Sequence, residues 1–193
     1  MKDIYQEIRN LAAPYLDTRK NYVHTDIAVE FAFILLEKVD GDIDVVIPAI
    51  ILHDVGWKTI PEEFQLLAYG PQVKSTKLNR MHEIEGAKIA EEILEKVNYD
   101  KDKTKEIIKI IDGHDSRKKA ISLNDRIVKD ADKLYRYSKE GLRIDCRRFS
   151  VTPKKAIETA ASNLDKWLFT DYAKKIARRE LKNRLKEFES NAE

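Results

Sequence analysis

The sequence has few cysteines, which crosslink small secreted proteins, and few glycines and prolines, which interrupt helices. It contains one cysteine, Cys146, so no internal disulfide can form. Glycine and proline are also few, with 6 and 5 residues in a chain of 193. Because these residues mark turns and strand ends, their scarcity disfavours a fold of many short strands. The opening residues 1–5 form no apolar leader, and with the single cysteine this predicts a cytoplasmic protein.

Long apolar runs and a strong charge imbalance are missing as well. The longest apolar runs, residues 31–36 and 45–52, are far shorter than the roughly 20 residues needed to cross a bilayer. The 36 lysines and arginines nearly balance the 34 aspartates and glutamates. These totals predict a soluble protein that binds neither membrane nor nucleic acid. The basic stretch 174–186 also carries an apolar stripe, so we interpret it as an ordinary amphipathic surface helix.

What the sequence does contain is a helical spacing of apolar residues. Hydrophobic side chains recur mostly every three or four positions, which predicts an all-α fold. The length suits one domain with its own core, so we expect a compact single-domain helical bundle over residues 1–193. The expected helices cover residues 2–13, 25–39, 44–53, 82–97, 102–113, 122–138, 153–169 and 170 onward. Long loops are expected at residues 55–81 and 141–151.

Polar side chains with metal-binding capacity gather at the ends of these helices. The chain has four histidines, each at or next to a helix end: His24, His53, His82 and His114. The apolar spacing around His53, His114 and Asp132 points these side chains inward. Several buried imidazoles and carboxylates are costly without a partner, and a shared divalent cation is the simplest partner. The mixed nitrogen and oxygen set suits Mn²⁺, Fe²⁺, Ni²⁺, Co²⁺ or Zn²⁺ better than Ca²⁺.

The pattern of these residues resembles the HD superfamily of metal-dependent phosphohydrolases. That family has an upstream histidine, a His-Asp doublet and a downstream aspartate, matched here by His24, His53-Asp54 and Asp132. The spacings are 29 positions from 24 to 53 and 78 from 54 to 132. The resemblance implies an HD-type helical fold in which these four residues hold a first metal ion.

The resemblance extends to two further histidines. His82 and His114 lie in motifs similar to those of small bacterial and archaeal HD proteins. In two-metal relatives such residues bind a second ion with Asp54 as the bridge, and in one-metal relatives they touch the substrate's phosphates. The implied cofactor is therefore one or two divalent ions, with Mg²⁺ added to the metals above.

The implied reaction is hydrolysis of a phosphoester or phosphoanhydride bond. The expected substrate is a small phosphorylated metabolite, with nucleotides and nucleoside triphosphates as the leading class. Asp54 and Glu83 are candidates for orienting or deprotonating the attacking water, although Glu83 is also explained as a carboxylate favoured at a helix start. Trp57 suits either a base-stacking role or the core. The candidate phosphate-binding cations lie close in sequence to expected ligands: Lys58, Arg80, Arg117, Lys118, Lys133 and Arg136.

Two other functions stay open. Some proteins with the HD fold are mixed-valent di-iron oxygenases with a similar six-ligand pattern, and the presence of both His82 and His114 keeps this alternative. A nucleotide-binding regulatory module without turnover is a third possibility, although a module that only binds has no need of all six ligands. The sequence does not decide the substrate, the leaving group, the number of ions or association into a homo-oligomer.

Overall fold

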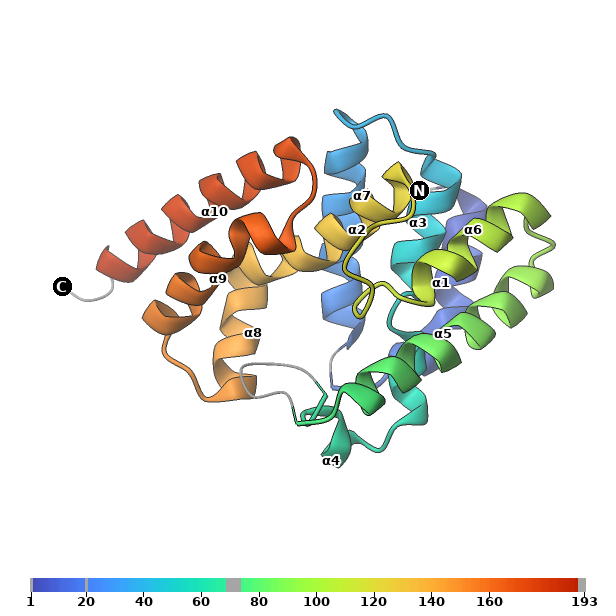
Figure 1. The fold of residues 1–193 in the computed structure, drawn as a ribbon, viewed down its shortest axis with the longest axis horizontal. Helices are drawn as coiled ribbons and strands as arrows, with labels where there is room; N and C mark the ends of the chain where they lie inside the picture. The colour runs from blue at the N-terminus through green and yellow to red at the C-terminus, as the bar shows by residue number, and fades with distance from the viewer. Residues whose placement is uncertain (1, 20, 69–73, 191–193) are drawn as a thin grey trace.

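All regular structure in the described part of the chain is helical, as expected from the apolar spacing. The computed structural model describes residues 2–19, 21–68 and 74–190 (Figure 1). The elements are α1 (Asp3–Leu16), α2 (Asn21–Leu36), α3 (Ile43–Leu52), η1 (Val55–Thr59), α4 (Glu62–Gln65), α5 (Thr76–Lys96), α6 (Lys101–Ile111), α7 (Leu123–Leu134), η2 (Tyr135–Tyr137), α8 (Lys139–Phe149), α9 (Pro153–Trp167) and α10 (Asp171–Ser190).

Helix α3 is the buried centre of the bundle. Asp42 caps its start by accepting a hydrogen bond from the backbone N–H of Asp44 at 2.8 Å. Residues 45–52 are apolar on every side and all are buried, as expected of a helix surrounded by others. Helices α1, α2, α6 and α7 pack around it. The helix ends at His53, so its C-terminal end delivers the His-Asp doublet to the interior.

Helix α7 joins the two parts of the bundle. It contacts α2 and α3 on one side and α9 and α10 on the other. Figure 1 shows α9 and α10 side by side at one end of the molecule, with α5 and α6 at the other. One apolar core runs from Tyr5 in α1 to Leu181 in α10. Among the described helices, none is both long and apolar enough to cross a membrane.

The expected loop at 141–151 is wrong, because most of that segment belongs to α8. Its apolar residues Leu142, Cys146 and Phe149 recur at i, i+4 and i+7, which is the signature of a helix. Ser138 caps the helix by accepting from the backbone N–H of Gly141 at 3.0 Å. The chain leaves the helix at Ser150, whose φ of 52° is left-handed.

The expected loop at 55–81 is also largely wrong. It contains η1 and α4, and α5 begins at Thr76 after a cap in which Ser75 Oγ accepts from the backbone N–H of Leu78 at 3.3 Å. Residues 69–73 of the expected loop lie outside the described part of the chain. His82 therefore sits inside α5 and not at its start. Helix α1 also runs past Pro14 to the buried Leu16, since a proline this near the end costs little helical hydrogen bonding.

Candidate metal centre

Two histidines follow the ends of helices α3 and α6 and are fixed there by the helix backbone. His53 Nδ1 donates to the carbonyl of Ile50 at 2.8 Å, three residues earlier. His114 Nδ1 donates to the carbonyl of Ile111 at 3.0 Å after α6. A proton held on Nδ1 leaves Nε2 as the coordinating nitrogen, which is the usual arrangement of metal-binding histidines. Both side chains are buried, so these nitrogens face the protein interior.

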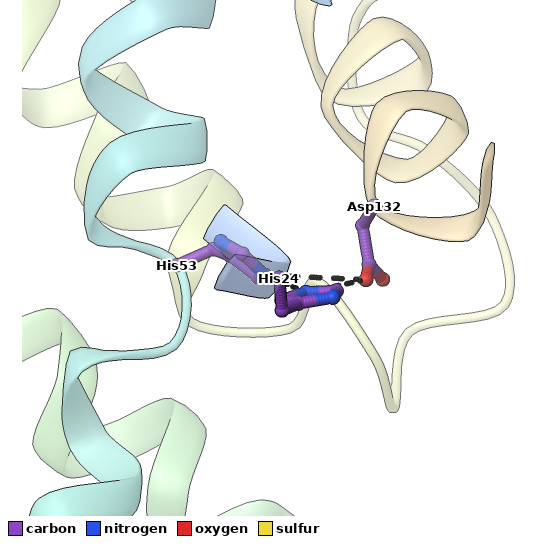
Figure 2. Close-up of side chains that lie close together, drawn as sticks. All are labelled: His24, His53 and Asp132. Carbon is purple, nitrogen blue, oxygen red and sulfur yellow. Dashed lines mark hydrogen bonds and ion pairs between the residues drawn. The ribbon is translucent and has the colours of Figure 1, made fainter. Parts of the chain in front are cut away.

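The first group of converging ligand atoms comes from three helices. His24 lies in α2, His53 follows α3 and Asp132 lies in α7. The Nε2 atom of His24 is 3.0 Å from Nε2 of His53 and 3.3 Å from Oδ1 of Asp132. Figure 2 shows the three side chains pointing toward one another, with His24 between the other two. One atom from each lies within 4.8 Å of the others, so the group can hold a metal ion.

A second group lies beside the first. It consists of His82 from α5 with His114 and Asp115, and it also meets the 4.8 Å criterion. The Nε2 atoms of His82 and His114 are 3.2 Å apart. The indole of Trp57 stacks on the His82 ring at 3.9 Å with 11° between the planes. Trp57 therefore orients a histidine. Asp115 is a candidate ligand beyond the six expected from the sequence, although His114-Asp115 repeats the His-Asp pair.

Asp54 stands between the two groups. Its Oδ2 is 3.5 Å from Nε2 of both His24 and His53. Its Oδ1 faces the other way, 3.6 Å from Nε2 of His114 and 3.9 Å from Nε2 of His82. Trp57 Nε1 donates to the same Oδ1 at 3.0 Å and fixes the plane of the carboxylate. One carboxylate thus presents one oxygen to each histidine pair.

The electrostatics of the cluster favour ionised carboxylates. Burial opposes ionisation of Asp54, but the charges of the surrounding histidines, His53 first, hold its pKa well below its usual range. Burial and the charge of His114 lower the pKa of His82 to about 4, so this imidazole is neutral at pH 7. Burial also opposes the charge of His114, but its hydrogen bond to Asp54 and the charge of Asp115 raise its pKa to about 9.

The donor set fits a divalent ion. Four imidazoles and three carboxylates form overlapping triads, a mixture that suits transition metals. All six ligands expected from the sequence are brought together: His24, His53, Asp54, His82, His114 and Asp132. A third group, His53, Asp54 and His114, shares one histidine with each of the other two, so the centre offers positions for one ion or for two.

The comparison with known families agrees with this geometry. The family model described as "HD domain" matches residues 21–137, more than half of the chain. The chain belongs to the HD domain family. The matched range begins at α2 and ends with η2, so it contains both histidine groups. No curated protein and no solved structure shows significant similarity to the chain. Membership places this HD domain in a family of metal-dependent phosphohydrolases.

Glu83 of the HD domain is buried and fully engaged in hydrogen bonds. Its Oε1 accepts from the backbone N–H groups of Asp115 and Ser116 at 2.8 and 2.7 Å. Its Oε2 accepts from the Ser116 hydroxyl at 2.6 Å and from Arg80 at 2.9 Å. These contacts hold the segment after His114 in place, which supports a positioning role. Because α5 begins at Thr76, the alternative of a helix-start carboxylate is wrong.

Of the expected phosphate-binding cations, Lys133 and Arg136 lie closest to the metal centre. Lys133 Nζ is 2.6 Å from Oδ1 of Asp115 and 2.7 Å from Oδ2 of Asp132. Arg136 pairs with Asp145 at 2.7 Å. Both residues line two neighbouring cavities. The small cavity is also lined by His24, Asp54 and Asp132, and the larger cavity lies next to it.

The other expected cations lie farther away or have structural contacts. Lys58 is exposed, donates to the carbonyl of Asp17 at 2.7 Å and lines neither cavity. Arg80 is bound to Glu83 and Asp112 and also lines neither. Arg117 and Lys118 line the larger cavity, but Arg117 also donates to carbonyls at the end of α6 and pairs with Asp125 at 3.2 Å.

The larger cavity has a volume of about 820 Å³ and combines cations with an apolar wall. Its basic side chains are Arg117, Lys118, Lys129, Lys133, Arg136, Lys155 and Lys166. Helices α8 and α9 and the residues after α9 supply apolar and aromatic groups, among them Phe149, Trp167 and Phe169. It shares His114, Asp115 and Lys133 with the small cavity, so the two open onto the same groups.

The small cavity also contains residues that sequence reasoning missed. Arg19, Asn21, Tyr135 and Arg148 line it together with His24, Asp54 and Asp132. Arg148 was hidden because its segment was expected to be a loop, whereas the i, i+4, i+7 spacing in α8 was a usable signal. Nothing local in the sequence marks Arg19 or Asn21, because only the packing of the turn before α2 brings them to the site.

Proposed function

We propose that this HD domain is a metal-dependent phosphohydrolase that cleaves a phosphoester or phosphoanhydride bond of a small metabolite. The observation that carries the proposal is the position of Asp54, with one oxygen toward each histidine pair in the small cavity that adjoins the larger basic cavity. The proposed ligands of a first ion are His24, His53, Asp54 and Asp132. The proposed ligands of a second ion are His82, His114 and Asp115, with Asp54 shared.

Hydrolysis needs a water molecule of lowered pKa and a polarised phosphoryl oxygen. A divalent ion held by these ligands would supply both. The chain's own residues do the rest. Lys133, between Asp115 and Asp132, places a positive charge at the rim of the site for the phosphoryl group. Asp54 is the candidate for orienting the attacking water, since it lies between both groups and its ionised form accepts hydrogen bonds.

Nucleotides and nucleoside triphosphates are the leading substrate class. The larger cavity has the volume of a site for a molecule of this size. Its seven cations suit a polyphosphate chain, and the aromatic side chains of Trp167 and Phe149 suit a base or another flat apolar group. Arg136 lies over the Trp167 ring at 5.8 Å, so charged and aromatic parts of the wall meet next to the metal centre.

The test is a metal analysis of the purified protein followed by a nucleotide panel, with phosphate and pyrophosphate both measured. We expect hydrolysis that depends on added Mn²⁺ or another transition metal and is abolished by chelation. Asp54→Asn keeps the shape of the side chain but removes its charge, and it should reduce both metal content and turnover at least 100-fold. Lys58→Gln is the control, because Lys58 lies outside both cavities. Full activity in Asp54→Asn would refute the proposed site.

A di-iron oxygenase is the second candidate, and the same observation favours it. A carboxylate shared between two histidine-containing groups suits a pair of iron ions as well as a pair of hydrolytic ions. Copurified iron with substrate-dependent oxygen consumption, and no phosphate release, would favour the oxygenase. Tight nucleotide binding without any turnover across several metals would instead favour a regulatory module.

A further inference from the structure

The wall of the small cavity beside the metal groups contains proposed metal ligands and also residues that are not proposed as ligands. The cavity volume is about 40 Å³, which admits only a few water-sized groups and excludes a base or a sugar. His24, Asp54 and Asp132 are among the ligands in the wall. The same wall also includes Arg19, Asn21, Tyr135, Arg136, Asp145 and Arg148.

Two guanidinium groups in that wall flank one carboxylate, and one of them also contacts the backbone of a third arginine, Arg19. Asp145 Oδ2 accepts from Arg136 at 2.7 Å, and Asp145 Oδ1 is 3.6 Å from Arg148. Arg148 also donates to the carbonyl of Arg19 at 3.0 Å. Burial, and then repulsion from Arg148, lowers the pKa of Arg19 to about 10. Arg19 and Arg148 therefore repel one another, and an anion placed beside them would relieve that repulsion.

The same wall contains two buried neutral donors. The side chains of Tyr135 and Asn21 belong to residues that are 2% and 4% exposed. Within the described residues, neither the Tyr135 hydroxyl nor the Asn21 amide nitrogen has a hydrogen-bond partner. The Tyr135 ring packs edge-on against His24 with ring centres 4.5 Å apart, which places it directly beside the first metal group. Buried donors without partners are uncommon and call for a ligand acceptor.

We propose that this cavity is the subsite for the phosphoryl group, in which Tyr135 and Asn21 donate hydrogen bonds to its oxygens and Arg19, Arg136 and Arg148 balance its charge. The inference rests on the proposed function and adds its substrate contacts. Phosphoryl oxygens only accept hydrogen bonds, so the two neutral donors match them without adding charge. The organic part of the substrate then lies in the larger cavity, since Lys133 and Arg136 line both spaces.

Two tyrosines in one short helix provide a matched test. Tyr135→Phe removes the donor from the subsite. Tyr137→Phe makes the same change in a buried side chain that lines neither cavity and donates to the carbonyl of Ala160 at 3.0 Å. The probe is inorganic phosphate, titrated calorimetrically into metal-free and Mn²⁺-loaded full-length protein. Manganese content is measured for every variant.

We expect Tyr135→Phe to weaken phosphate binding about fivefold to tenfold, the effect of losing one hydrogen bond. Its Mn²⁺ content should be unchanged, and its Tm should be equal to or above that of the wild type because no protein hydrogen bond is lost. Tyr137→Phe should show the reverse pattern, with a lower Tm and unchanged phosphate affinity. Asn21→Ala should weaken phosphate binding in the same way as Tyr135→Phe. Equal phosphate affinity in Tyr135→Phe, Asn21→Ala and the wild type would overturn the subsite.

Hydrolysis by the wild-type protein reports separately on the proposed function. If the wild type hydrolyses nucleotides but Tyr135→Phe changes neither phosphate affinity nor KM, the subsite is wrong and the function stands. If the wild type binds phosphate in a Tyr135-dependent way but hydrolyses no phosphoester, the anion subsite stands and the function is wrong. No phosphate binding by the wild type, with or without Mn²⁺, also overturns the subsite.

Discussion

At the scale of single residues, burial and hydrogen bonding indicate whether Glu83 positions its neighbours or acts as a general base. All of its hydrogen bonds go to Arg80 and the 115–116 segment. Burial opposes ionisation of Glu83, but the charge of His114 and these hydrogen bonds hold its pKa below the usual range. A group that holds its neighbours so firmly is a poor proton acceptor, because protonation would cost those hydrogen bonds.

We therefore predict that Glu83→Gln lowers the free energy of unfolding by about 1–3 kcal/mol, as expected for a disturbed buried acceptor. Its kcat should fall less than about tenfold, whereas loss of a general base costs about 10²–10⁴-fold. Urea unfolding and steady-state kinetics measure the two effects. Glu85→Gln, two residues along α5 in an exposed pair with Lys88, is the control. A large loss of kcat with unchanged stability would make Glu83 the base after all.

The His82 and His114 pair leads to a pH prediction. With a pKa of about 9, His114 carries an extra proton at pH 7, while His82, with a pKa of about 4, does not. A metal ion needs the deprotonated nitrogen, so binding to this pair should release about one proton at pH 7. Metal affinity should rise as the pH rises from 7 to 9 and level off above 9.

Calorimetric titration with Mn²⁺ in two buffers of different ionisation enthalpy measures this proton release. The variant His114→Gln should release about one proton fewer than the wild type. Proton release that is the same at pH 7 and pH 10 would contradict the assignment of the proton to His114.

Sequence reasoning identified the ligands whose signal is local and missed those that depend on packing. His53-Asp54 stands out because two polar residues end an apolar helix. Arg19 and Tyr135 show no such contrast with their neighbours, and their importance comes from the meeting of α2, η2 and α8. Lys58 shows the converse, since nearness in sequence to Asp54 does not bring it into the lining of either cavity.

At the scale of elements, the contact between η1 and α5 positions His82. It depends on Gly56, because a Cβ atom there would lie 1.9 Å from the carbonyl oxygen of His82 and 2.5 Å from the backbone nitrogen of Gly86. A Cβ on Gly86 would meet its nearest neighbour at 3.3 Å, which is tight but not an overlap. Position 56 therefore has no room for a side chain, whereas position 86 has nearly enough room for a methyl group.

Gly56→Ala should therefore lower the free energy of unfolding by about 2–3 kcal/mol, since the overlap is with backbone that cannot move aside cheaply. It should also reduce the number of bound metal ions, because His82 is displaced. Gly86→Ala, the matched control, should cost less than about 1 kcal/mol and keep its metal. Urea unfolding and metal analysis compare the two variants. Equal stability of both would show that η1 does not depend on this close approach.

The helices themselves were predictable where apolar residues repeat at regular intervals and caps are local. Ser122 and Thr152 cap α7 and α9 as their sequence patterns predict, accepting from Asp125 and Lys155 at 3.1 and 3.3 Å. The prediction failed where polar residues dilute the pattern, as in α8 and the first turns of α5. In both cases a serine N-cap was present, but the charged residues nearby obscured the helical spacing of the apolar residues.

At the scale of the whole molecule, the metal centre joins helices that are far apart in the chain. Its ligands come from α2, α5 and α7 and from the residues after α3 and α6, so one ion would link at least three parts of the fold and two ions would link all five. Anything that binds only the folded state stabilises it by mass action.

We predict that Mn²⁺ at about 100 times its dissociation constant stabilises the fold by about 2.7 kcal/mol. For a chain of this length that raises Tm by roughly 5–10 °C, since each kcal/mol is worth about 2–4 °C. Thermal unfolding monitored by circular dichroism measures the shift, and chelation should reverse it. In Asp54→Asn the shift should fall below about 2 °C. An equal shift in that variant would mean that the stabilising ion binds elsewhere.

The two-sided position of Asp54 has a final consequence for the formal charge of the site. The pKa directions leave Asp54, Asp115 and Asp132 ionised and Lys133 and His114 protonated at pH 7, so these five groups sum to minus one. One divalent ion in the first position brings that sum to plus one. A second ion, which displaces the proton of His114, brings it to plus two. Occupancy of the second position would thus strengthen the attraction that an arriving phosphate dianion encounters.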